Sequence, residues 1–233
     1  MNVRALPLLL SVLLPGAALA APLAVETRKV DVEFHISHPA KEYDANLLPD
    51  GASATIQIDP KAIEATTASF TIKVDHFDSE NTRRDSHMLE VMEAFVYPTI
   101  DWSVTKVSGA TGAWTAGSHT FTAEGPLTVH GVTKPLKVPV NVTVGDDGAL
   151  TFAAGFSIAL EDHGIERPTL VFVPIENDVP IKVTVSSKAN PDLIAAATAE
   201  PPAPEPDPAP EGSEDAATDE GAASGGEEAA KSE

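Results

Sequence analysis

The chain of 233 residues contains no cysteine. This absence excludes disulfide bonds, a thiol nucleophile, zinc sites built on thiolates and a lipid-modified N-terminal cysteine. A fold without disulfides or metal staples has to be held together by its apolar core.

Positive charge is also scarce. The chain has 15 Lys and Arg against 35 Asp and Glu, which gives a net charge of −20. Nucleic-acid affinity comes from cations on phosphates, so we expect no nucleic-acid partner. Anionic membrane surfaces would repel the chain as well. The charge indicates a neutral or cationic partner, or solubility alone.

The motifs of several enzyme classes are missing. The sequence has no Gly-x-Ser-x-Gly, no His-Glu-x-x-His, no phosphate loop and no dinucleotide fingerprint. Its seven histidines are scattered, so we predict no metal site. We predict that the protein is not an enzyme. An acid–base site on His87 and Asp85 is a lesser alternative.

Long apolar runs are absent except near the N-terminus. There an apolar run from Ala5 to Leu14 follows Arg4, and Ala18-Leu19-Ala20 has the form of a cleavage site. A bilayer span needs about 20 apolar residues, so this run is too short. We predict a signal peptide over residues 1–20, a mature chain from Ala21, and export to the periplasm or the extracellular space.

The other end of the chain differs in composition from the middle. Residues 198–233 hold 11 acidic residues, one lysine and no aromatic residue. Such a segment cannot bury enough apolar surface to offset the entropy of ordering it. We predict a globular domain over residues 21–197 and a disordered Pro/Ala-rich acidic tail over residues 198–233. The tail is interpreted as a solubilising tether or as a docking segment for a basic protein partner.

Residues 24–190 alternate between apolar and polar side chains in about eight segments, as strands with one buried face do. The alternating segments run over Val30–Ile36, Ala54–Ile58, Phe70–Val74, Ile100–Val104, Phe121–Val129, Leu136–Val144, Leu150–Leu160 and Ile181–Val185. The pattern predicts an all-β antiparallel sheet of about eight strands. Periodicity alone leaves open whether the sheet closes into a barrel or splits into a two-layer sandwich.

One short helix interrupts the strands. Met88, Val91, Met92 and Phe95 follow the spacing of one helical face, and Pro98 ends the pattern. If the sheet closes into a barrel, we expect this helix to lie across one of its mouths.

A polar cluster precedes and enters this helix, with Asn81, Arg84, Asp85 and His87 as its main members. It has two interpretations. It is a hydrogen-bonded network that fixes the helix entrance, or a polar rim that contacts the headgroup of a ligand.

Apolar residues on the predicted inner faces are the candidate ligand contacts, together with two from the helix. They are Phe34, Ile36, Phe70, Met88, Phe95, Trp102, Leu127, Val129 and Phe156. A barrel of this size can be packed solid, so aromatic residues on the inner face do not by themselves predict a cavity.

Two separate motifs carry a family resemblance. Asn81, Arg84, Asp85 and His87 are followed by Tyr97-Pro98, and later by His130-Gly131-Val132-Thr133-Lys134-Pro135. Over residues 24–188 the chain resembles the YceI-like family. The resemblance implies a lipocalin-like barrel whose elongated apolar pocket holds a polyisoprenoid chain, with His130 in the polar rim or network.

These expectations combine into one function. We expect an exported protein that carries an isoprenoid or quinone-like lipid, with no other cofactor and no stable membrane span. The alternative is a non-enzymatic interaction module with a solid barrel, whose acidic tail docks a basic partner.

Overall fold

The computed structural model describes residues 22–170 and 172–199. The predicted signal peptide, and the predicted tail beyond Ala199, lie outside the described residues.

Eight long strands occur where alternation predicted them. They are β2 (Thr27–Ile36), β4 (Ala52–Asp59), β5 (Ala62–Lys73), β7 (Thr99–Val104), β9 (Gly117–Val129), β10 (Val132–Val144), β11 (Leu150–Ala159) and β14 (Asp178–Ser187). Six shorter strands were not expected. They are β1 (Leu23–Val25), β3 (Tyr43–Leu47), β6 (Phe77–Asp78), β8 (Lys106–Ser108), β12 (Thr169–Leu170) and β13 (Val173–Pro174).

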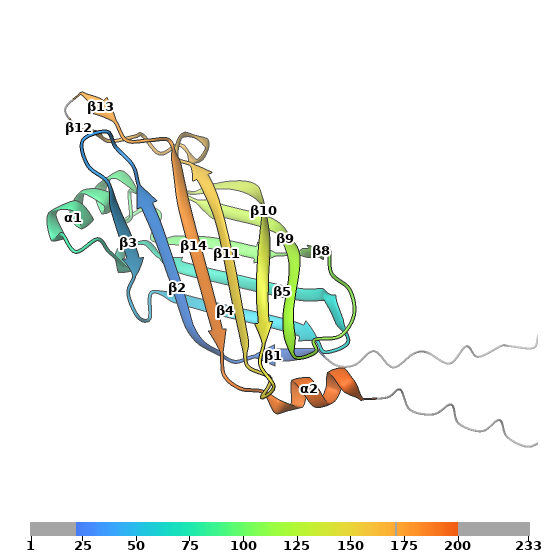
Figure 1. Cartoon of the computed structure of the whole chain (residues 1–233). Helices are drawn as coiled ribbons and strands as arrows, with labels where there is room; N and C mark the ends of the chain where they lie inside the picture. Colours follow the sequence, from blue (N-terminus) through green and yellow to red (C-terminus); the bar gives the residue numbers. More distant parts are fainter. Residues whose placement is uncertain (1–21, 171, 200–233) are drawn as a thin grey trace, which may run out of the picture. The chain divides into compact units, whose positions relative to one another are not determined.

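The strands pair antiparallel in a strongly curled 12-stranded sheet, and β12 and β13 form a separate hairpin (Figure 1). The order is β1-β4-β5-β7-β9-β10-β11-β14-β2-β3-β6, with β8 attached to β9. The prediction of an all-β antiparallel fold is therefore confirmed. The predicted closed eight-stranded barrel is not: the sheet is a curled half-barrel. The short strands β3 and β6 extend the edge beyond β2, and among the described residues no ladder joins that edge to β1 and β4.

The inner face of the sheet is apolar because side chains alternate along each strand. Strand β10 shows this clearly: Val138, Val140, Val142 and Val144 are buried, and the residues between them are exposed. Its register pairs Val142 with Phe152 of β11, so both strands present their apolar side chains to the same interior.

Gly125 lets β9 exchange partners and increases the curl. One part of β9 pairs with β7 through Trp102 and Leu127, whereas Glu124 faces Lys106 of β8. A Cβ atom at Gly125 would lie 1.8 Å from the carbonyl oxygen of Ser103. Only glycine permits this close backbone approach, as is usual where a strand bends.

The described residues contain two α-helices rather than the one predicted. Helix α1 (Thr82–Val91) ends earlier than its apolar spacing indicated, and turns follow as far as Val96. Helix α2 (Pro191–Thr198) lies where the sequence analysis placed only the end of the domain. Its Leu193 is fully buried. Neither helix is long and apolar enough to cross a membrane.

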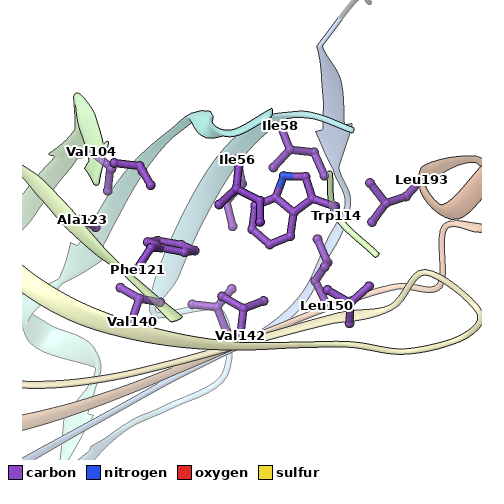
Figure 2. Packing of buried hydrophobic residues seen from close by; sticks show 14 residues of the cluster. Ile56, Ile58, Val104, Trp114, Phe121, Ala123, Val140, Val142, Leu150 and Leu193 are labelled. Carbon is purple, nitrogen blue, oxygen red and sulfur yellow. The ribbon is translucent and has the colours of Figure 1, made fainter. Parts of the chain in front are cut away.

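Helix α2 lies at the end of the half-barrel opposite to α1 (Figure 1). Trp114, from the loop between β8 and β9, is completely buried there and packs beside Ile58, Leu150 and Leu193 (Figure 2). A Cβ atom at Gly148 would lie 1.9 Å from the carbonyl oxygen of Asn190, so the β10–β11 turn packs tightly against the start of α2. This end of the molecule is therefore filled by side chains.

Candidate ligand-binding cavity

A cavity of about 240 Å³ lies between the inner face of the sheet and α1. Its walls come from all eight long strands, from α1 and from residues 160–175. Almost every lining side chain is apolar. Among the lining residues, only Arg84, His87 and Tyr43 carry a basic or hydroxyl group. The interior is thus hollow rather than packed solid, a question that the sequence left open.

Eight of the nine apolar residues predicted to contact a ligand do line this cavity. They are Phe34, Ile36, Phe70, Met88, Trp102, Leu127, Val129 and Phe156. The ring of Trp102 stacks on that of Phe70, with centroids 5.7 Å apart. Its indole nitrogen is buried and has no hydrogen-bond partner among the described residues. The cavity therefore has one unpaired donor in its wall.

Phe95 is the exception and corrects the sequence analysis. Its side chain is fully exposed and does not line the cavity. The physical reason is the early end of α1 at Val91, because the turns that follow do not keep the helical spacing that would place Phe95 below Met88 and Met92.

The polar cluster is organised around Ser79, which the sequence analysis did not single out. Asn81 caps α1 by accepting a hydrogen bond from the backbone N–H of Arg84 at 3.1 Å. The Arg84 guanidinium donates to the Ser79 hydroxyl and to its carbonyl oxygen. Asp85 accepts from the backbone N–H of Ser79 at 3.0 Å and from its hydroxyl. This network fixes the entrance of the helix, as the structural interpretation expected.

Arg84 also belongs to the cavity wall, where its guanidinium lies 4.0 Å from the centre of the Tyr43 ring. Burial removes water from the Tyr43 phenol and raises its pKa; the charge of Arg84 opposes this shift and that of Asp85 adds to it. Tyr43 was not among the predicted site residues. Alternation of Tyr43, Ala45 and Leu47 in β3 was the signal that could have found it.

His87 lines the cavity, although it is largely exposed, and lies 3.6 Å from a carboxylate oxygen of Glu90. Asp85 bonds to Ser79, and among the described residues no hydrogen bond joins Asp85 to His87. The geometry gives no support to an acid–base pair between them.

The second motif meets the first at the far end of α1. His130 and Gly131 have φ values of 51° and 73°, as the two-residue turn between β9 and β10 requires. The rings of His130 and Tyr97 lie 4.5 Å apart. The Nε2 atom of His130 is 3.4 Å from a carboxylate oxygen of Glu93. His130 therefore does not line the cavity but attaches the segment after α1 to this hairpin.

Within the described ranges, no three histidine, aspartate or glutamate side chains come together as metal ligands would. The polar groups at the cavity are the guanidinium of Arg84, the imidazole of His87, the phenol of Tyr43 and the indole N–H of Trp102. Such a set can hydrogen-bond an oxygen of a ligand at one end of an apolar chain.

Residues 23–187 match the YceI-like domain. A UPF0312 protein of Pseudomonas savastanoi pv. phaseolicola is 27% identical over 176 residues, which cover 72% of this chain and 88% of that protein. A UPF0312 protein of Shewanella sp. strain W3-18-1 is 29% identical over 167 residues, covering 67% of this chain and 83% of that one.

Solved structures agree on the fold. Burkholderia cenocepacia BcnA superposes with a TM-score of 0.59 at 18% identity, covering 68% of this chain and 96% of BcnA. A polyisoprenoid binding domain from Saccharophagus degradans superposes with a TM-score of 0.54 at 14% identity, covering 72% of this chain and 98% of that domain. The curled sheet, the two motifs in contact and the match over residues 23–187 lead to one conclusion: the chain belongs to the YceI-like family.

Proposed function

We propose that this protein binds and carries an isoprenoid-type lipid, such as a quinone with an isoprenoid tail, in the cavity of its half-barrel. One observation carries the proposal: the hollow interior is about 240 Å³ and its lining is apolar except at the end near α1. An apolar cavity of about 150 Å³ already stays dry and takes up benzene. The polyisoprenoid binding domain of Saccharophagus degradans shares this fold, which supports the ligand class.

The driving force is burial of the apolar chain. Each methylene that leaves water for such a cavity gains about 0.8 kcal/mol. Branched and aromatic side chains in the wall, such as Ile36, Phe70 and Phe156, offer close contacts to methyl branches without requiring hydrogen bonds. A chain-like ligand therefore gains affinity along its whole length, and no catalytic step is needed.

The polar end of the ligand is assigned to the α1 end of the cavity. Arg84 and Tyr43 lie together there, and Ser79 holds the guanidinium in place. A carbonyl or phosphate oxygen would accept hydrogen bonds from Arg84 without displacing its partners, since a guanidinium has five N–H donors.

Filling the cavity tests the proposal. Ala154 points into the cavity, whereas its neighbour Ala153 is exposed on the outer face of β11. Ala154→Trp should lower the uptake of a fluorescent isoprenoid at least about tenfold, since it occupies space that several methylenes would fill. Ala153→Trp is the matched control and should bind as the natural protein does. If both variants took up the isoprenoid equally well, the ligand would bind outside this cavity.

Native mass spectrometry of the purified protein gives the ligand class directly. We expect a bound mass that extraction identifies as an isoprenoid lipid. A ligand-free mass, with no uptake of added isoprenoid, would reject the proposal. We further propose export to the periplasm or the extracellular space, and cell fractionation with N-terminal sequencing should find the protein outside the cytoplasm and beginning near Ala21.

A further inference from the structure

We propose that the α1 end of the molecule docks onto the surface of a neutral lipid bilayer, so that the cavity mouth faces the membrane. Five apolar side chains at this end are exposed to solvent and form what we call the docking tips. They are Phe95, Val96, Leu170, Phe172 and Val173. The inference rests on the proposed function, because it names the membrane as the source and destination of the lipid.

The docking tips come from two segments at the same end of the molecule. Phe95 and Val96 follow α1, and the other three belong to the β12–β13 hairpin, which lies at the same end in Figure 1, opposite to α2. Met92 from the turn after α1 and Ile175 from the base of the hairpin pack in one apolar cluster and line the cavity. Both protrusions are therefore attached next to residues that line the cavity.

Polar contacts hold each protrusion in place, so the exposure of the docking tips is not that of a loose chain end. The buried His38 donates through Nε2 to the carbonyl oxygen of Val173 at 3.1 Å, and Arg167 donates to that of Ile175 at 2.9 Å. On the other side, Glu93 lies beside His130 and the backbone N–H of Tyr97 donates to the Glu93 carbonyl oxygen.

The exposure itself is unusual. Phe95 and Phe172 are 101% and 98% exposed, although phenylalanine is among the residues most often buried. Of the six large apolar side chains that are exposed among the described residues, five are docking tips and the sixth is Leu48, between β3 and β4. Apolar exposure is thus concentrated where a lipid would enter.

The observations favour a bilayer over a second protein chain. A stable protein interface needs roughly 20–30 residues on each side, whereas the docking tips are five residues on two separate protrusions. Aromatic tips suit the boundary between headgroups and acyl chains, where peripheral proteins bury them. The net charge of −20 would repel the protein from anionic lipids, so the bilayer that we propose as the partner has a zwitterionic surface.

Vesicle flotation tests the docking without any ligand. The probe is phosphatidylcholine–phosphatidylethanolamine vesicles, and the protein is residues 21–233 with the acidic segment kept. Phe95→Gln and Phe172→Gln should each weaken vesicle binding about tenfold, since burial of one phenylalanine is worth about one power of ten. Leu48→Gln is the matched control and should bind unchanged. Adding phosphatidylserine should weaken binding at low salt.

Three results would overturn the proposal: no flotation of the natural protein, equal flotation of the double variant Phe95→Gln/Phe172→Gln, or a change from dimer to monomer in that variant without any vesicle binding. The last result would assign the tips to a second copy of the chain. Because the substituted side chains are exposed, the variants should keep the natural melting temperature.

Lipid transfer separates this inference from the proposed function. The double variant should take up a fluorescent isoprenoid from dilute ethanol as the natural protein does, but about tenfold more slowly from vesicles. If the double variant lost uptake from both ethanol and vesicles, Phe95 and Phe172 would be needed for lipid binding itself, and the proposal that they act only in docking would be wrong. Absence of uptake by the natural protein, with flotation intact, would reject the cavity function and leave the docking.

Discussion

Arg84 is the residue on which the chemistry of the cavity depends. Sequence patterns alone placed it in a polar cluster with two interpretations, and the structure combines both. The guanidinium donates to Ser79, which fixes the helix entrance, and its central carbon lies over the ring of Tyr43 in the cavity wall. A residue can therefore be structural and face the ligand at the same time.

Tyr43 gives a prediction for alkaline pH. Burial raises the pKa of its phenol above the unfolded value of about 10, so the folded state holds this proton more tightly. The contribution to stability is complete below pH 10 and is lost as the pH rises through the unfolded value toward the folded one. Urea unfolding of Tyr43→Phe should show a smaller fall in stability between pH 9 and 11 than the natural protein. Parallel pH profiles of the two proteins would contradict this expectation.

Gly131 gives a prediction about packing. Its φ of 73° strains any other residue, and an added Cβ atom would lie 2.6 Å from the Tyr97 ring. Gly112 has a φ of 95° with open space around it. Gly112→Ala should cost about 1 kcal/mol from backbone strain, and Gly131→Ala should cost more, up to about 3 kcal/mol. Chemical denaturation measures both. An equal cost would mean that Tyr97 moves aside freely.

At the scale of elements, α1 stands apart from the rest of the fold. No residue within it is buried, whereas each of the eight long strands contains at least one buried residue. The helix is held by its cap and the Ser79 network at one end, and by the contacts of Glu93 and Tyr97 with the β9–β10 turn at the other. A helix with little buried surface opens more easily than the sheet beneath it.

Removing the cap should therefore loosen α1 selectively. Asn81→Ala should destabilise the helix by about 1 kcal/mol and increase amide exchange across Thr82–Val91, while the strands keep their protection. Hydrogen exchange with mass spectrometry resolves the two regions. Arg83→Ala, at an exposed position of the first turn, is the control and should change neither. Uniform loss of protection in the Asn81 variant would mean that the helix and sheet unfold together.

The elements also show how far the sequence could predict the structure. All eight alternating segments are strands, because a period of two in a half-buried strand is a strong signal. Strands of two or three residues, such as β6 and β13, are too short to show a period. The helix end at Val91 was missed because Met92 and Phe95 keep helical spacing in sequence although the chain has left the helix. In the cavity, Tyr43 and Ser79 were missed because their roles depend on contacts between distant segments.

On the scale of the whole molecule, the half-barrel has two unlike ends. The α2 end is filled by Trp114, Leu193 and their neighbours (Figure 2), and the α1 end borders the cavity and its polar groups. Helix α2 lies beyond residues 23–187 that match the YceI-like domain, yet it supplies a fully buried leucine to the core.

Leu193→Ala should therefore destabilise the protein by about 2–5 kcal/mol, as loss of a buried leucine does. Ala195→Ser, at an exposed position of α2, should cost less than about 0.5 kcal/mol. Urea denaturation compares the two. A small effect of the Leu193 substitution would show that α2 contributes little to holding the filled end.

The chain has two tryptophans, and their positions make them natural optical reporters of separate events. Trp102 is stacked in the cavity wall, where a quinone or a labelled lipid would quench its emission by direct contact. Trp114 lies outside the cavity lining in the filled end, and loses its dry surroundings only when that end opens. In the Trp102→Phe variant, the remaining Trp114 would report on unfolding alone. In the Trp114→Phe variant, the fluorescence of Trp102 would report mainly on whether a ligand occupies the cavity.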